Sequence, residues 1–435
     1  MTSEIVIMNR AAIAMAADSA VTLSGYSRDK IFPSAQKLFT LSDHAPVGIM
    51  VYGNADFMSV PWETIIKMYR SKNGNNVFPK LEDYANDFID FLEGNETLFS
   101  EDIQDDMFEH SLYLFLNYLK EMLLTSIQRI LHSEQRLVYD EELETTLSDI
   151  LEYQYNEWNN AKLSPGFFDE FDEQLHSKYG ETIDKLISKV FEEFPLDDDN
   201  VKILKTIIPW FFSRFPHNIK NNSYSGIVVA GFGESEIFPS FKSYIIEFMV
   251  CNKLKYELDK QETISSDKSV VISPFAQREM VDMFMRGIDS SIFEFSVSFL
   301  DEAVMGLIEH FKENDCVNID SAEYTKLNEH AQMLVKDYIT KMQQIQDENY
   351  TSPITNVVSM LPKDELASMA ESLINLTSFK RKISLDSETV GGPIDVAIIS
   401  KGDGLIWIKR KHYFKSELNP QYFINKYKGA YEHER

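Results

Sequence analysis

The chain has 435 residues, of which 44% are hydrophobic, and its 69 acidic residues against 42 basic ones give a net charge of −27. This length can bury a large core and suggests two or three domains, while the acidic balance argues against a nucleic-acid surface, because phosphates require basic patches. The two cysteines, Cys251 and Cys316, predict no disulfide framework and a reducing, cytoplasmic location. The sequence shows neither a signal peptide nor an apolar run of membrane-spanning length, so we expect no membrane contact.

The amino-terminal residues predict a β-hairpin. Residues 5–8 and 11–17 are apolar runs of strand length, and Asn9-Arg10 between them is a turn signal. If Met8 pairs with Ala11, the pairing sets Thr2 opposite Ala17, next to Asp18.

A second hairpin is predicted from residues 37–41, through a turn at 42–46, to residues 47–52. Pairing Leu41 with Val47 brings Lys37 to the level of Val51. That register places Lys37 beside the turn Gly53-Asn54, and the two hairpins together bring Lys37 and Asp18 towards Thr2.

These residue types suit nucleophilic catalysis. A free α-amino group titrates near ~8, so Thr2 would carry its own general base once Met1 is removed. A buried Lys37 would lower the pKa of that hydroxyl, Asp18 would orient Lys37, and a backbone N–H of Gly53 or Asn54 would hold the oxyanion. Each residue alone has an ordinary alternative, because Asp-Ser pairs are common in turns and most lysines are solvated.

The segments 13–19, 37–39 and 52–56 resemble the opening of proteasome β subunits and of the related bacterial heat-shock protease, which are N-terminal nucleophile hydrolases. The resemblance implies that Thr2 is the nucleophile and that Asp18 and Lys37 are its partners. The family's Gly-Gly turn is a single Gly53 here, so either Gly53 or Asn54 is the expected oxyanion donor.

Residues 390–407 resemble the family's terminal hairpin, in which an Asp and a Ser before the Gly-Gly support the terminal amine. Asp386 and Ser387 are the candidates for those roles, and Val390 departs from the expected Ser. The strand at residues 269–273 is expected to lead through Pro274, at a first helical position, into a helix. By resemblance Ser273 would contact the terminal amine; the alternative is an ordinary helix cap.

The fold that we expect is α+β, a four-layer αββα sandwich of the proteasome type with a large all-helical insertion. The acidic segment 94–222 has long patterns of 3.6-residue period without a strand pattern. The expected parts are residues 2–93 as the first half of the sandwich, 94–222 as the helical insertion, 223–289 as central strands and a helix, 290–350 as a second helical insertion, and 351–435 as the last helix and hairpin.

Other chemistries find little support, because the nine His residues form no zinc-binding pattern and Gly231-Phe-Gly233 is too short for a dinucleotide loop. We therefore expect no cofactor and no metal. The leading hypothesis is a threonine peptidase acting on peptides or unfolded protein. The alternatives are an inactive proteasome-like scaffold or binding protein and an amidase of small molecules. The resemblance leaves open self-assembly or an ATP-dependent unfoldase as partner, and the insertion is expected to cover the cleft and replace ring contacts.

Overall fold

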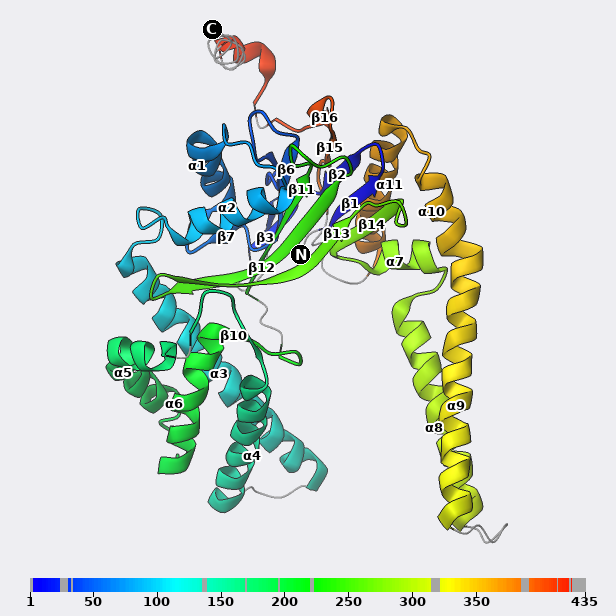
Figure 1. Cartoon of the computed structure of the whole chain (residues 1–435). Helices are drawn as coiled ribbons and strands as arrows, with labels where there is room; N and C mark the ends of the chain where they lie inside the picture. The colour runs from blue at the N-terminus through cyan, green and yellow to red at the C-terminus, as the bar shows by residue number, and fades with distance from the viewer. Residues whose placement is uncertain are drawn as a thin grey trace.

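The computed structural model describes residues 3–23, 30–32, 34–134, 139–168, 170–194, 196–219, 223–313, 321–384, 391–412, 414–421 and 424. Within these residues, helices and antiparallel sheets make an α+β chain (Figure 1). In the described part of the chain, no helix is long and apolar enough to cross a membrane.

The first five-stranded sheet, called sheet I, has the order β14-β1-β2-β15-β16, and every pair in it is antiparallel. Its strands come from both ends of the chain and, for β14, from its middle. They are β1 (Ser3–Asn9), β2 (Ile13–Ala17), β14 (Val270–Ala276), β15 (Asp395–Ser400) and β16 (Gly404–Lys409).

The second five-stranded sheet, called sheet II, has the order β13-β12-β11-β6-β5 and is also antiparallel throughout. Its strands are β5 (Leu38–Thr40), β6 (Val47–Gly53), β11 (Ser225–Gly231), β12 (Ser240–Val250) and β13 (Lys253–Thr263). Three short two-stranded ribbons accompany the sheets: β3 (Val21–Leu23) with β4 (Lys30–Phe32), β7 (Asp56–Phe57) with β8 (Val60–Pro61), and β9 (Lys162–Leu163) with β10 (Arg214–Phe215).

The two sheets pack face to face through one buried apolar cluster, to which Val6 and Met15 contribute from sheet I and Met50 from sheet II. The sheets approach closely at Gly48, where an added Cβ would lie 3.0 Å from side-chain carbons of Ile399 and Leu405 on the opposite sheet. Only a glycine leaves room for this contact without displacing its neighbours.

Helices cover the outer faces of both sheets (Figure 1). Sheet I packs on α11 (Lys363–Ile383), whose Leu366, Ala370 and Ile374 are buried against the strands. Sheet II packs on α1 (Trp62–Asn73) and α2 (Leu81–Glu93). Buried side chains recur along α2 at the three- and four-residue spacing that makes one continuous apolar face.

Residues 94–219 are mainly helical, in α3 (Glu101–Glu134), α4 (Asp140–Asn159), α5 (Phe171–Val190) and α6 (Asp198–Ser213). This helical segment joins the core of sheet II through aromatic contacts: the Phe115 and Phe211 rings stack with centroids 4.4 Å apart, and the Phe211 ring lies tilted against Phe248 with centroids 5.7 Å apart. The ribbon β9–β10 interrupts the segment, so the expectation of an all-helical region was wrong at this point.

A second helical region follows β14 and α7 and projects from the sheets as a long hairpin of α8 (Ser290–Glu313) and α9 (Ser321–Gln346) (Figure 1). The remaining elements are α7 (Glu279–Arg286), a π-helical turn (Asp347–Thr351), α10 (Ser352–Val358) and a 3₁₀ turn (Ser416–Leu418).

The predicted junction at Pro274 was wrong, because Pro274 lies inside β14 and not at the start of a helix. β14 is an edge strand of sheet I, where a residue without an N–H can face away from the ladder. The helix begins later, at Glu279.

Candidate active site

The first hairpin has a longer turn than the sequence predicts. Met8 pairs with Ile13, whereas the sequence predicts Ala11 as its partner. The Asn9 Oδ1 accepts hydrogen bonds from the N–H groups of Ala11 and Ala12, at 2.9 and 3.1 Å, so this side chain closes the turn. The register therefore moves by two residues, which keeps every side chain on its predicted face.

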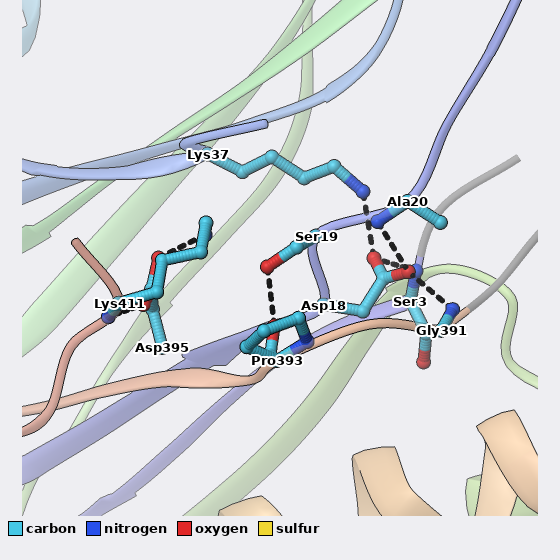
Figure 2. Close-up of polar contacts among 9 residues, drawn as sticks. All are labelled: Ser3, Asp18, Ser19, Ala20, Lys37, Gly391, Pro393, Asp395 and Lys411. Atoms are coloured by element: carbon cyan, nitrogen blue, oxygen red, sulfur yellow. Dashed lines mark hydrogen bonds and ion pairs between the residues drawn. The ribbon is translucent and has the colours of Figure 1, made fainter. Parts of the chain in front are cut away.

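This register brings Asp18 opposite Ser3, the residue that follows Thr2. The Asp18 N–H donates to Ser3 O at 3.1 Å, and the Ser3 N–H donates to Asp18 Oδ1 at 3.1 Å. Asp18 Oδ2 accepts from the N–H groups of Ala20 and Gly391, at 3.3 and 2.9 Å (Figure 2). The Asp18 carboxylate is fully buried and is thus held by three backbone donors.

Lys37 completes this arrangement. Its Nζ donates to Asp18 Oδ1 at 2.7 Å, and its side chain is only 5% exposed (Figure 2). The Val51 N–H donates to Lys37 O at 2.9 Å, and the Leu41 N–H donates to Val47 O, which confirms the predicted register of the second hairpin. A buried ion pair now stands beside the backbone of Ser3.

Residues 391–393, from the carboxyl-terminal part of the chain, lie along one side of the site. The Ser19 N–H donates to Gly391 O at 3.2 Å, and the Ser19 hydroxyl donates to Pro393 O. These contacts hold the end of β2 against the residues that lead into β15, which places the Gly391-Gly392 pair at the site.

The two candidate oxyanion donors differ in the structure. The Asn54 N–H already donates to Tyr224 O at 3.0 Å. N–H groups of alternate strand residues point the same way, so the Gly53 N–H faces the side on which the Val51 N–H meets Lys37. Gly53 has φ +81°, and a Cβ there would lie 2.4 Å from Tyr224 O. Because the Asn54 N–H is already bonded and the Gly53 N–H faces the side of Lys37, Gly53 is the better-placed donor.

Glu4 is a titratable residue that the sequence reasoning missed. It is fully buried on the same face of β1 as Val6, and neither carboxyl oxygen has a hydrogen-bond partner. Burial raises the pKa of Glu4 well above its usual value, with Lys37 opposing and Asp18 adding to the effect. A single acidic residue in a strand gives no sequence signal that it lies near a buried lysine.

One expected site residue, Ser273, is not brought to the ion pair. Ser273 is buried but pairs with Val6, four positions along β1 from position 2, so it lies deeper between the sheets. Thr2, Asp386 and Ser387 lie outside the described residues. Among the residues that the structure describes, no group of acidic, His and Cys side chains could hold a metal ion.

The arrangement can hold a protonated amine against a carboxylate beside the first residues of β1. The fixed positive charge of Lys37 favours a developing anion in its neighbourhood. The neutral Gly53 N–H is a candidate hydrogen-bond donor to such an anion.

No protein-family model matches the sequence, and no curated protein matches it either. Two similar solved structures are Anbu (ancestral beta-subunit) from Yersinia bercovieri and an Anbu Gly-1 mutant from Hyphomicrobium sp. strain MC1. The first is 10% identical with a TM-score of 0.25 and covers 99% of this chain and 94% of that one. The second is 9% identical with a TM-score of 0.23 and covers 100% and 96%. At these TM-scores neither likeness carries an argument about activity.

These findings correct the resemblance to proteasome β subunits and the bacterial heat-shock protease. The similar structures are named as ancestral beta-subunits, and no family model assigns the chain to either of those two groups. The reason is physical: the resemblance rested on short segments at the two ends of the chain, residues 13–19, 37–39, 52–56 and 390–407, whereas α3 to α6, α8 and α9 have no part in it.

Proposed function

We propose that the chain is a threonine-type peptidase whose nucleophile is Thr2, exposed as the amino terminus by removal of Met1. The single observation that carries the proposal is the buried Asp18–Lys37 pair, 2.7 Å apart and bonded to the backbone of Ser3. We further propose that the two stacked sheets and their outer helices form the four-layer sandwich of N-terminal nucleophile hydrolases.

In this mechanism the Thr2 hydroxyl attacks the scissile carbonyl and gives its proton to the terminal amine. The carbonyl becomes an oxyanion that the Gly53 N–H stabilises. The protonated amine then donates to the departing amine of the substrate, leaving an ester on Thr2. Water hydrolyses the ester by the same route, and the enzyme is restored.

Lys37 and Asp18 have different roles in this mechanism. The Lys37 ammonium favours the alkoxide of Thr2 by its charge, and Asp18 fixes the position of Lys37. Three backbone N–H donors hold the Asp18 carboxylate, so the pair stays in place without a substrate. The proposed substrates are peptides or unfolded protein.

The test is hydrolysis of fluorogenic peptides by the full chain. Thr2→Ala is expected to abolish turnover, and Lys37→Ala to reduce it by roughly 10²-fold or more, the scale of a positioned acid–base group. Lys67→Ala, which breaks an exposed ion pair with Glu63, is the control and should leave turnover unchanged. Unchanged turnover in the Lys37→Ala chain would remove Lys37 from the mechanism.

A second candidate function, a proteasome-like scaffold without activity, is favoured by one observation. Val390 stands where the resemblance expects a Ser near the terminal amine. A chain that lacks Met1, folds, and hydrolyses no peptide would favour this scaffold over the peptidase.

A further inference from the structure

The structure contains a cavity of about 700 Å³ between the helical segment and the ends of β11 and β12. This volume lies within the range of small-molecule and side-chain pockets. Its walls come from both parts of the molecule and are mainly apolar, including Leu114, Tyr118, Trp158, Phe215, Tyr224 and Ile245.

The cavity is built on a fixed frame. Gln104 of α3 is buried and exchanges two hydrogen bonds with Asn252 at the β12–β13 turn, at 2.8 and 2.7 Å. The helical segment therefore cannot slide along the sheet without breaking both bonds, and the walls keep their spacing.

One carboxylate at the floor of the cavity is paired with a buried lysine. Glu247 has a side chain that is 6% exposed, and Lys255 Nζ lies 2.7 Å from its Oε2. The same Nζ donates to Phe211 O at 2.7 Å and lies 5.1 Å from the Phe248 ring centroid. Burial also raises the pKa of the neighbouring Glu257. Lys162 and Glu257 also line the cavity, so the apolar walls are the surface that an apolar group would contact.

The cavity adjoins the candidate active site. Tyr224 and Ser223 belong to its wall, and Tyr224 O accepts the Asn54 N–H at 3.0 Å. The Asn54 side chain donates to the Ser223 hydroxyl at 3.3 Å. An extended peptide advances by about 3.3–3.5 Å per residue. A substrate peptide whose scissile bond lies beside Gly53 would therefore reach the cavity within a few residues.

We propose that this cavity is a substrate subsite that receives one large apolar side chain of an extended peptide, a few residues from the bond that is cleaved. The subsite rests on the proposed peptidase function, which gives the peptide its place beside Gly53. His110, Ser111 and His217 line the same cavity and supply polar groups for the backbone of the peptide.

The test is calorimetric binding to the full chain with Thr2→Ala, the variant that is expected to abolish turnover. The probe is a short Ser–Gly peptide with one Phe, and its matched control carries Asp in place of Phe. We expect the Phe peptide to bind about 30-fold more tightly, equivalent to about 2 kcal/mol. Adding Leu114→Ser, which removes an apolar part of the wall, or Ser111→Trp, which fills the cavity, should in each case remove most of this difference.

Leu131→Ser is the control variant, because Leu131 is on the same helix, is 40% exposed against 48% for Leu114, and does not line the cavity. It should bind as the parent does. Equal affinity for the Phe and Asp peptides, or unchanged binding in both cavity variants, would overturn the subsite. So would binding of a small apolar dye without binding of the Phe peptide. Selective binding of the Phe peptide without cleavage by the unsubstituted chain would retain the subsite and reject the peptidase.

Discussion

The Asp18–Lys37 pair should show a large energetic coupling in a double-mutant cycle. At 2.7 Å and an effective dielectric constant near 20, two unit charges attract by roughly 6 kcal/mol before the cost of desolvation. Asp18→Asn leaves the Lys37 ammonium buried without its counter-charge, which is expected to cost about 3–5 kcal/mol of unfolding free energy.

Lys37→Met should cost less, about 2 kcal/mol, because Asp18 still accepts three backbone N–H bonds. The double variant should then lose about 2–3 kcal/mol less than the sum of the single losses. Urea unfolding of the four chains, followed by circular dichroism, gives the coupling. The exposed pair Glu63–Lys67 is the control and should show about 0.3–0.5 kcal/mol. Additive losses at Asp18 and Lys37, within about 0.5 kcal/mol, would refute a functional ion pair.

Two further predictions concern Glu4 and Gly53. Because the pKa of Glu4 is raised in the folded state, the folded chain keeps a proton that the unfolded chain releases above pH 4.5, so stability falls as pH rises. Glu4→Gln should flatten this decline, measured as urea midpoints between pH 4.5 and 8. Parallel declines in the two chains would exclude Glu4 as the source. Gly53→Ala should lower stability by at least about 1–2 kcal/mol, because an L-residue is strained at φ +81° and its Cβ meets Tyr224 O. Gly180→Ala, at a helical position with no atom near the added Cβ, should instead raise stability by up to about 1 kcal/mol, and equal effects of the two variants in urea unfolding would exclude strain at Gly53.

The sequence predicted the second hairpin correctly because a turn-rich segment lies between two short, mainly apolar runs. That register alone placed Lys37 at the level of Val51. The first hairpin was predicted with the wrong register, since the Asn9 side chain closes a longer turn than its two-residue signal suggests. After the two-residue shift Asp18 lies next to the backbone of Ser3. It still forms the ion pair with Lys37.

Features that depend on contacts between distant segments could not be read from the sequence. Glu4 is buried without a hydrogen-bond partner only because the two sheets pack over it. The cavity forms only because α3 and α4 pack beside β12. The strand β13 was missed because much of its length is polar and partly exposed, so its pattern resembles a loop. The resemblance could not identify the family, because it compared only short segments at the two ends of the chain.

The measurement that tests the central claim most directly is the intact mass of the full chain after treatment with a peptide β-lactone. Ring opening by a hydroxyl forms an ester and adds the whole mass of the lactone to the nucleophile. We predict a chain that lacks Met1 and carries one adduct, located on Thr2 by fragmentation and absent from the Thr2→Ala chain. A peptide-hydrolysing chain that retains Met1, or an adduct on another residue, would contradict the account.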